Sequence, residues 1–500
     1  MTRALVLSLA LGAALLLGRP ALAGAQDRTP GEQLPVREHT LANGMRLLVL
    51  PRPGAPTVSF VVRYEVGGVH EHLGTTGIAH LLEHLLFKGT RSIGTHNAAG
   101  EEVLFLRMDA AHDTLVHARA RGDSTEVRRL ATAIAELEDS ARVFVEPNEL
   151  DRIFTKAGAR GLNATTTNEA TTYYVELPSN RAELWFVLEG DRMANPVFRE
   201  FYTERDVVME ERRMRVETNP GGLLYEVHMG TAFQVHPYGV PVVGTMSDLE
   251  SLSRRDVADY FRRFYAPNNA VVGIVGNVDP DRVLAWAEKY LAWVPGGEEP
   301  TPVIAREPAQ RGERRVEVVW DAEPALRIGW HVPDWFDDDA PALSVLTSLL
   351  TGGRTARLHR RLVLDDRSVS GVTSSMGPGE RFPQLFQIDA TPQSPHTPSE
   401  VEAAIYEELA RLAAEGPSLD ELERVRNQIA AGNVRRLQSN LGLAFQLVES
   451  ASLSGDWRET FRLPERLRAV TPDDIRRVVA RYFTSENRTV GTLVRARVAP

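Results

Sequence analysis

Two segments of this 500-residue chain resemble each other although they lie far apart in the sequence. They are "SLSRRDVADYFRRFYAPNNAVVGIVG" at residues 251–276 and "AVTPDDIRRVVARYFTSENRTVGTLV" at residues 469–494. Each has the pattern of a capped helix, an aromatic pair, a turn with asparagine and a strand that contains or ends in glycine. The simplest explanation is the internal duplication of an α+β unit. We therefore expect an α+β fold of two homologous halves, each an α/β sandwich.

A stretch rich in proline, glycine and glutamate separates the two expected halves. It reads "VPGGEEPTPVIAREPAQRGE", and this composition is typical of a linker. We therefore predict an N-terminal domain at residues 26–292, a linker at residues 293–313 and a homologous C-terminal domain at residues 314–500.

The first half contains two further features that bear on its fold. Residues 39–68 carry an Asn43-Gly44 turn signal and then two apolar, β-branched runs, which predict paired strands. A charged stretch rich in alanine and arginine, at about residues 104–147, has helical periodicity and predicts a helical insertion. A coiled-coil contact is one interpretation of this stretch, but a solvated helical hairpin is favoured.

The first 25 residues have the pattern of a secretory signal peptide. Arg3 precedes an apolar run at residues 4–17, and two A-x-A sites follow, so we expect cleavage near Ala23 or Ala25. A membrane anchor is the alternative, but the run is short for a span and no later stretch is apolar for 18 residues. The chain has no cysteine, so it can form neither a disulfide nor a lipid-modified cysteine. These features predict a secreted or periplasmic bacterial protein without a stable membrane span.

The charge balance of the chain argues against a nucleic-acid partner. There are 57 basic and 67 acidic residues, a formal net charge of −10, and removal of the leader takes away Arg3 and Arg19. The mature chain is therefore more acidic still, whereas nucleic-acid binding favours a basic surface.

The sequence "GIAHLLEHLLFKGT", residues 77–90, places two histidines and a glutamate within an otherwise apolar helical pattern. On a helix, His80, Glu83 and His84 share one face. Two imidazoles four residues apart can hold one metal ion with the carboxylate beside them. Histidines buried or solvated for structural reasons are the alternative, but the combined H-x-x-E-H pattern favours a metal site.

A catalytic zinc ion usually has three protein ligands, so two histidines need a third. The segment "FYTERDVVMEERRMRVE", residues 201–217, is helical by pattern and places Glu204 and Glu211 on one face, with Glu210 turned away. Charge-rich helices are usually solvated, so spacing alone leaves this segment one candidate among several.

Six motifs in a fixed order resemble the insulinase/pitrilysin family of zinc peptidases, the inverzincins, whose signature is H-x-x-E-H. The similarity extends over essentially the whole mature chain. Within the family, the chain resembles the beta subunits of mitochondrial processing peptidase. The motifs are "EHLGTTGIAHLLEHLLFKGT", "LNATTTNEATTYYVELP", "DRMANPVF", "ERDVVMEE", "HPYGVPVVG" and "FYAPNNAVVGIVGNVD".

The resemblance implies a zinc endopeptidase with one Zn²⁺ per chain that acts on peptides or unfolded segments. The family pattern makes Glu211 the third ligand beside His80 and His84, and it makes Glu204 an acid that supports the site. Glu83 is then the general base that moves the proton of the attacking water.

The resemblance also implies a substrate-binding strand. The segment "GLNATTTNEATTYYVELP" is similar to the family's edge strand, which pairs with an extended peptide through main-chain hydrogen bonds. Asn163, Ala164 and Thr165 are the expected contacts. Without the resemblance, an ordinary internal strand would be the favoured interpretation.

The chain departs from the family pattern in its second half. Family active sites use an arginine and a tyrosine seven residues apart, whereas the matching stretch here, residues 351–372, has Arg361 and then Ser368. We therefore expect a heterodimer with a related subunit that carries the Arg/Tyr pair, with a homodimer as the alternative. A non-catalytic core-type subunit and a peptide-binding module of the same fold are the rival functions.

Overall fold

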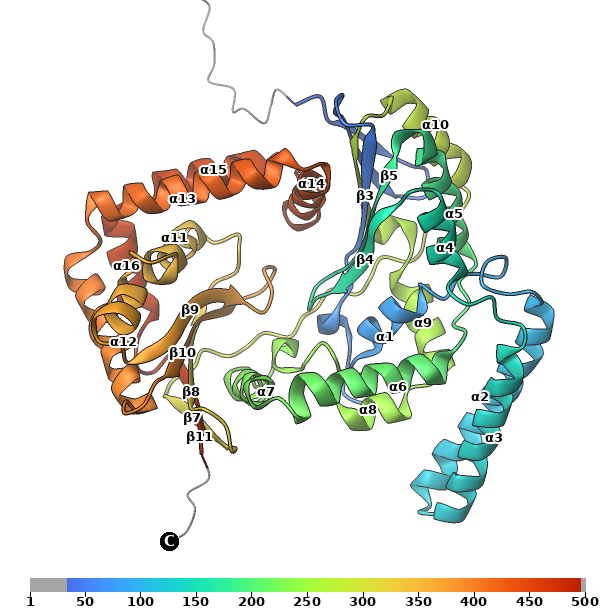
Figure 1. Ribbon diagram of the computed structural model, residues 1–500, viewed down its shortest axis with the longest axis horizontal. Helices are drawn as coiled ribbons and strands as arrows, with labels where there is room; N and C mark the ends of the chain where they lie inside the picture. Colours follow the sequence, from blue (N-terminus) through green and yellow to red (C-terminus); the bar gives the residue numbers. More distant parts are fainter. Residues whose placement is uncertain (1–33, 496–500) are drawn as a thin grey trace, which may run out of the picture.

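The computed structural model describes residues 34–495, and the expected signal peptide at residues 1–25 lies outside them. Two mixed β-sheets stand apart in the described chain, each flanked by helices (Figure 1). The expected α+β fold of two similar halves is confirmed.

The first sheet has six strands. In spatial order they are β1 (Arg37–Thr40), β2 (Arg46–Pro51), β6 (Ala270–Gly276), β3 (Thr57–Tyr64), β5 (Thr171–Pro178) and β4 (Arg160–Thr166). β2 and β6 are parallel, and the other neighbours are antiparallel. β4 is therefore the last strand of the sheet on one side.

The prediction that the two apolar runs of residues 39–68 pair with each other is wrong. They form β2 and β3, but β6 lies between them and pairs with both. The Asn43-Gly44 turn joins β1 to β2 instead, and Gly44 has the positive φ of +88° that such a turn requires. All of β6 is buried, and its apolar pattern does not reveal which two strands it will join.

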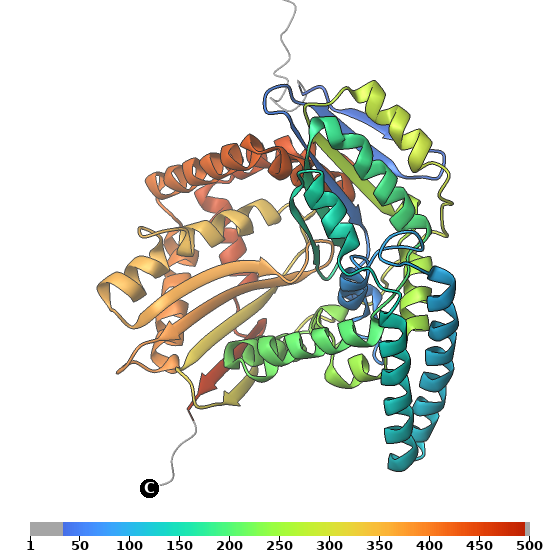
Figure 2. The ribbon, with the colours of Figure 1, turned by 45° about the vertical axis from the view of Figure 1, so that its right-hand side comes forward.

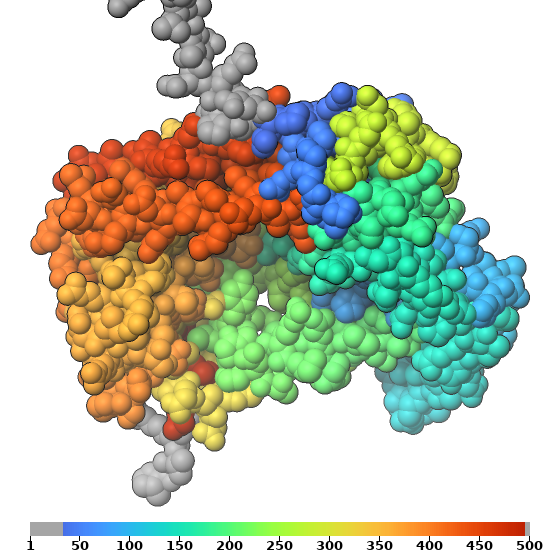
Figure 3. Space-filling model, turned by 45° about the horizontal axis from the view of Figure 1, so that its top comes forward, coloured from blue at the N-terminus to red at the C-terminus, as the bar shows by residue number. Residues whose placement is uncertain are grey.

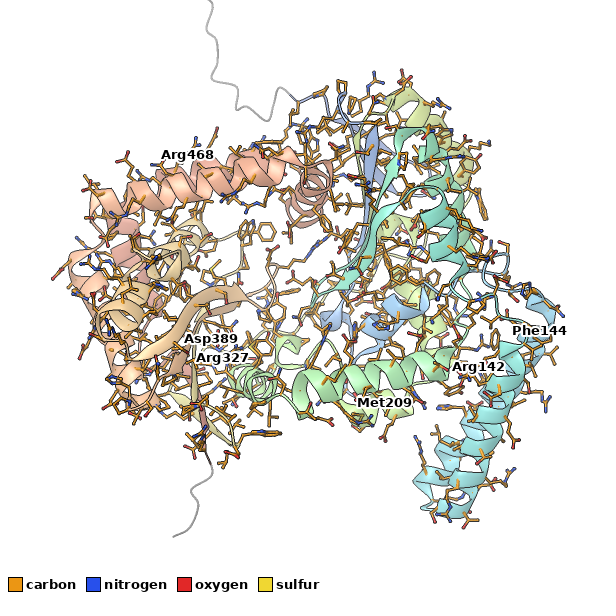
Figure 4. All side chains as sticks on the ribbon, in the orientation of Figure 1. Arg142, Phe144, Met209, Arg327, Asp389 and Arg468 are labelled. Atoms are coloured by element: carbon orange, nitrogen blue, oxygen red, sulfur yellow. The ribbon has the colours of Figure 1, made fainter. Side chains whose placement is uncertain are left out.

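The second sheet repeats this plan with five strands. In spatial order they are β7 (Arg314–Val319), β11 (Arg488–Val494), β8 (Ala325–Val332), β10 (Gln384–Pro392) and β9 (Val369–Gly377). β11 is parallel to β7 and antiparallel to β8, as β6 is to β2 and β3. Arg327 on β8 pairs with Asp389 on the neighbouring β10 at 2.6 Å (Figure 4).

The duplicated segments occupy equivalent positions in the two halves. α9 (Arg254–Phe264) leads to β6, and α16 (Pro472–Tyr482) leads to β11. Both helices begin with a capping box, formed by Ser253 and Asp256 in the first and by Thr471 and Asp474 in the second. The similarity seen in the sequence therefore reflects the same local structure.

The remaining helices pack around the sheets, apart from one hairpin that projects from the first half. In the first half they are α1 (Ile78–Leu85), α2 (Ala98–Ala120), α3 (Ser124–Arg142), α4 (Glu149–Lys156), α5 (Ala182–Ala194), α6 (Phe201–Arg212), α7 (Pro220–Ala232), α8 (Met246–Ser251) and α10 (Pro280–Tyr290). In the second half they are α11 (Ala340–Thr351), α12 (Pro398–Glu415), α13 (Leu419–Gln438), α14 (Asn440–Ser454) and α15 (Glu459–Ala469). Among residues 34–495, none of the helices combines the length and the apolar character needed to cross a membrane.

One helix of each half packs against the sheet of the other half, and we call these two the exchanged helices. α14 packs against β3 and β6, and α7 packs against β7 and β11. Alternation along β2 places Leu47 in the main core of the first half and Leu48 in a separate core with Leu447 of α14. The two halves are thereby joined by buried apolar surface as well as by the linker.

The space between the halves is open. The surface is hollowed there, with residues of α6 and α7 visible at the bottom of the hollow (Figure 3). α1 lies close to α6 and to the edge strand β4 in this region. Residues from three separate parts of the first half therefore meet beside the hollow.

The expected helical insertion is a hairpin of α2 and α3 that projects from the first half (Figure 2). Its helices span residues 98–142, so it starts somewhat earlier than the pattern predicted. At its base, the fully buried Arg199 pairs with Glu101 of α2 at 3.0 Å and donates to carbonyls of loop 88–93. Arg142 of α3 donates to Thr203 of α6 at 3.0 Å (Figure 4). The loop that follows α1 is thus tied to the hairpin.

Candidate metal centre

The short helix α1 is placed by tight contacts at its start. Gly77 precedes it with φ of +88°, and a Cβ there would come within 2.8 Å of the carbonyl of Val243. The carboxylate of Glu71 accepts hydrogen bonds from the main-chain N–H groups of Gly77 and Ala79 at 2.8 and 2.9 Å. Burial raises the pKa of Glu71 to about 8, although these hydrogen bonds act in the opposite direction. The sequence gives no signal for this role of Glu71.

The structure brings His80, His84 and Glu211 together. One ligand atom of each residue lies within 4.8 Å of the others. His80 Nε2 is 3.5 Å and His84 Nε2 is 3.7 Å from the same oxygen, Glu211 Oε2. The two histidines come from successive turns of α1, and the glutamate comes from α6, which packs against α1.

The donor set fits a zinc ion. Glu211 Oε2 is buried and has no hydrogen-bond partner in the described structure, which is costly for a carboxylate unless an ion or a donor occupies the space beside it. Burial lowers the pKa of His80 to about 3, so its ring is neutral and able to coordinate. Two imidazole nitrogens and one carboxylate oxygen are a common ligand set of catalytic zinc.

Glu204 holds the ring of His84 from the other side. His84 Nδ1 lies 3.2 Å from Glu204 Oε2, and Lys88 Nζ lies 2.6 Å from Glu204 Oε1. Burial alone would lower the pKa of His84, but the hydrogen bond and the charge of Glu204 raise it. A carboxylate on the outer nitrogen of a histidine fixes both its tautomer and its orientation. Lys88 lies three residues beyond the end of α1, so helical spacing could not have indicated this contact.

Glu83 projects from the same face of α1 and meets the edge strand. Its Oε2 accepts a hydrogen bond of 2.5 Å from the hydroxyl of Thr166, the last residue of β4. Burial raises the pKa of Glu83, whereas the hydrogen bond from Thr166 lowers it. Thr166 was not among the site residues expected from the sequence, although it follows Ala164 by two residues and therefore faces the same side of the strand.

The helix that carries Glu211 separates it from its neighbour Glu210, as the helical pattern predicts. Glu210 is exposed and pairs with Arg213 at 2.8 Å, while Glu211 Oε1 pairs with Arg215. The segment of residues 201–217 is not one regular α-helix, because its last turn, Arg213–Glu217, is a π-helix.

β4 is an edge strand of the first sheet. Within the described chain it pairs only with β5, and the pairing is irregular between Arg160 and Asn163. Asn163 and Thr165 are exposed, and Ala164 between them is buried. The N–H of Ala164 donates to Asn163 Oδ1 at 2.9 Å. The free side of β4 thus lies at the edge of the sheet.

Arg361 and Ser368 are both bonded within the second half. Arg361 donates to the carbonyl of Ala404 at 2.9 Å and pairs with Glu407 of α12. Ser368 is buried, and its hydroxyl donates to the carbonyl of Leu362 at 3.3 Å. In this chain these two side chains are therefore committed to internal contacts.

Comparisons with known proteins agree with this arrangement. Residues 144–246 match the family "Insulinase (Peptidase family M16)", and residues 251–429 match "Peptidase M16 inactive domain". The zinc protease PqqE of Helicobacter pylori is 28% identical over 374 residues, which cover 73% of this chain and 71% of that protein. A probable mitochondrial-processing peptidase subunit beta of Arabidopsis thaliana is 23% identical, over 91% of this chain and 78% of that protein.

Solved structures share the fold. The crystal structure of a protease from Helicobacter pylori superposes with a TM-score of 0.78 at 24% identity, covering 92% of this chain and all of that one. The periplasmic protease PqqL from Escherichia coli gives a TM-score of 0.67 at 17% identity and covers 92% of this chain and 47% of its own. With its two matched domains and its His/His/Glu cluster, the chain belongs to the insulinase family of zinc proteases, peptidase family M16.

Proposed function

We propose that this chain is a zinc-dependent endopeptidase that hydrolyses peptides or unfolded polypeptide segments. The observation that carries the proposal is the unpartnered Glu211 Oε2 facing His80 and His84, with Glu83 on the same helical face. His80, His84 and Glu211 hold one Zn²⁺. When bound, the ion supplies Lewis-acid activation of water and of a peptide carbonyl.

Within this proposal, the other residues of the centre move protons and maintain geometry. Glu83 takes the proton of the attacking water and passes it to the leaving amine. The raised pKa of Glu83, a consequence of burial, makes it a stronger proton acceptor than an exposed glutamate. Glu204, itself held by Lys88, keeps the ring of His84 in its coordinating orientation.

The peptide substrate adds to the free edge of β4. Main-chain hydrogen bonds supply the binding energy, so recognition depends weakly on the substrate sequence. Asn163, Ala164 and Thr165 contact the peptide. The N–H of Ala164 donates to Asn163 Oδ1 in the free chain and donates to a substrate carbonyl when the peptide binds.

The functional units follow the duplication. Residues 26–292 are the zinc peptidase domain, with the helical insertion at about residues 104–147. Residues 293–313 are the linker, and residues 314–500 are the homologous, inactive domain. The match of residues 251–429 to an inactive peptidase domain supports the last assignment, although it begins before the linker.

We further propose that the chain works in the periplasm or outside the cell and as part of a dimer. The name of the Escherichia coli periplasmic protease supports the location, which requires signal cleavage near Ala23 or Ala25. The internal bonding of Arg361 and Ser368 supports a heterodimer, in which a related subunit supplies an arginine and a tyrosine to the substrate. A homodimer is the alternative.

Metal analysis combined with peptide cleavage tests the proposed function. The purified mature chain should contain about one zinc per chain and cleave an unstructured peptide library, alone or with a related subunit. A chelator should abolish cleavage, and added zinc should restore it. Cleavage that survives complete metal removal would contradict the proposal. Zinc-loaded chain that binds peptides but cleaves none, with or without a subunit, would instead identify a binding module or a core-type subunit.

A further inference from the structure

The hydroxyl of Thr166 makes one directed contact in the centre. It lies 2.5 Å from Glu83 Oε2 and 3.5 Å from the hydroxyl oxygen of Thr171. Thr171 donates its own proton to the carbonyl of Val66 at 3.0 Å. A hydroxyl has a single proton to donate, and the shorter contact to a carboxylate is much the stronger one. The proton of Thr166 is therefore directed at Glu83.

The contact leaves the two oxygens of Glu83 in different states. Oε2 is held by Thr166, while Oε1 has no hydrogen bond to any residue between 34 and 495. A glutamate has three rotatable side-chain bonds, so an anchor on one oxygen restricts where the other can lie. Proton transfer requires that free oxygen within hydrogen-bond distance of the reacting group.

We propose that Thr166 is a positioning residue for the peptidase reaction, whose hydroxyl holds Glu83 so that its free oxygen faces the reacting water. The inference rests on the proposed function, because it assigns a partner to the base named there. Thr166 acts through Glu83 and touches neither the metal nor the scissile bond.

The same contact links the base to the strand that receives the peptide. Thr166 belongs to β4, three residues beyond Asn163, and the alternation of the strand turns Ala164 and Thr166 toward α1 and Asn163 and Thr165 toward the outside. A peptide paired with β4 therefore has a fixed position relative to Thr166, the residue that holds Glu83. The register of strand pairing and the position of the base are thus set by one short segment.

The test compares three substitutions in the zinc-loaded full chain. Thr166→Val keeps the β-branched shape and removes only the donor, and Thr166→Ser keeps the donor. Thr172→Val is the matched control, because Thr172 is a buried strand threonine on the neighbouring β5 with no side-chain hydrogen bond in the described structure. The readouts are kcat, KM, zinc content and thermal unfolding.

We expect Thr166→Val to lower kcat by about 10- to 100-fold, the scale typical of a misplaced catalytic group, with KM changed less than about twofold. Zinc content should stay at the wild-type level. Thr166→Ser should recover most of kcat, and Thr172→Val should match the wild type. In a Glu83→Gln background, Thr166→Val should have no further effect on kcat, because the two residues act as one unit.

The outcomes separate this inference from the proposed function. A fully active Glu83→Gln variant would overturn the proposed function itself. Loss of turnover in Glu83→Gln together with wild-type kcat in Thr166→Val would overturn only the role of Thr166. Loss of zinc or of the cooperative unfolding transition in Thr166→Val, with no recovery in Thr166→Ser, would show that the residue is merely structural and would also overturn the inference.

Discussion

Three glutamates lie around the two histidines of α1, and their surroundings give them different chemistry. Burial raises the pKa of Glu83, which suits a proton acceptor. Burial also acts to raise the pKa of Glu204, but the hydrogen bonds from His84 and Lys88 outweigh it and keep Glu204 ionised. Glu211 presents a buried oxygen without a partner to both histidines. These surroundings support the proposed roles of Glu83 as proton acceptor, Glu204 as support for His84 and Glu211 as metal ligand.

The assignment of Glu83 as base predicts the behaviour of Glu83→Gln. The amide has nearly the same shape but cannot accept a proton, so we expect kcat to fall by about 100- to 10,000-fold. Zinc should remain bound at the wild-type level, because the side chain is not a ligand. Turnover and metal content measured on the same preparation check both statements, and a zinc-free variant would show that the roles are misassigned.

The neighbours Glu210 and Glu211 provide an internal comparison. Glu211→Gln should lower metal content sharply, since it replaces a ligand oxygen that faces both histidines. Glu210→Gln should leave it unchanged, because Glu210 pairs with Arg213 at the surface. Glu204→Gln should lower the affinity for zinc by about 10- to 100-fold, because the ring of His84 is no longer held in its coordinating orientation. Equal zinc affinities for the Glu210 and Glu211 variants, measured by competition with a chelator, would contradict the assignment.

At the scale of helices and strands, local patterns could be predicted and distant pairings could not. The capped helices α9 and α16 and the strands after them follow from capping boxes and apolar runs, which are local signals. The position of β6 between β2 and β3 depends on residues more than 200 positions apart. The same limit applies to α7 and α14, because an apolar helix face does not specify which sheet will cover it.

The exchanged helix α14 requires a glycine on the sheet beneath it. A Cβ at Gly273 of β6 would come within 2.5 Å of Val448 Cγ2 and 3.1 Å of the carbonyl of Ala444. Gly273→Ala should therefore destabilise the protein by about 1–3 kcal/mol, as overpacked cores do. Gly371→Ala on β9 is the control, since a Cβ there meets nothing within 4 Å. Urea unfolding measures both, and equal midpoints would show that α14 does not pack as described.

The other exchanged helix, α7, carries a buried histidine that should make stability depend on pH. Burial lowers the pKa of His228 to about 4, and Nε2 contacts the carbonyl of Thr489 at 3.1 Å. Between about pH 6.5 and pH 4 the unfolded chain binds a proton at this residue and the folded chain does not. The contribution of the neutral His228 to the free energy of unfolding is therefore fully present above pH 6.5. It decreases by about 3 kcal/mol as the pH falls to 4. Unfolding of His228→Gln should show a shallower loss over this range than the wild type, whereas identical slopes would contradict this origin.

At the scale of the whole molecule, the two halves are joined at a buried carboxylate as well as by the exchanged helices. Glu169, on the loop between β4 and β5, accepts hydrogen bonds from the main-chain N–H groups of Glu380 and Arg381 and from the hydroxyl of Tyr238. Arg381 pairs in turn with Glu65 of the first half at 2.7 Å. The sequence predicts two halves and their order, but these contacts become visible only once the halves are docked.

The candidate site shows the same division between local and distant information. The common face of His80, Glu83 and His84 follows from helical spacing alone. Glu211 is separated from His84 by 126 residues, and among many carboxylates only the resemblance to a family selected it. Thr166 was not selected, because a strand pattern predicts which face a residue occupies but not which helix it will meet.

The last prediction concerns the chain as one member of a dimer. Arg361 and Ser368 are bonded inside the second half, so these two positions do not offer the arginine and tyrosine donors that the proposed mechanism needs at the substrate carbonyl. Loss of one such donor typically lowers the rate by about 100- to 1,000-fold. The purified, zinc-loaded chain should therefore cleave an unstructured peptide slowly. A related subunit with the Arg/Tyr pair should raise kcat by at least that factor and form a mixed dimer in sedimentation. Full activity of the lone chain, unchanged by any such subunit, would exclude the heterodimer.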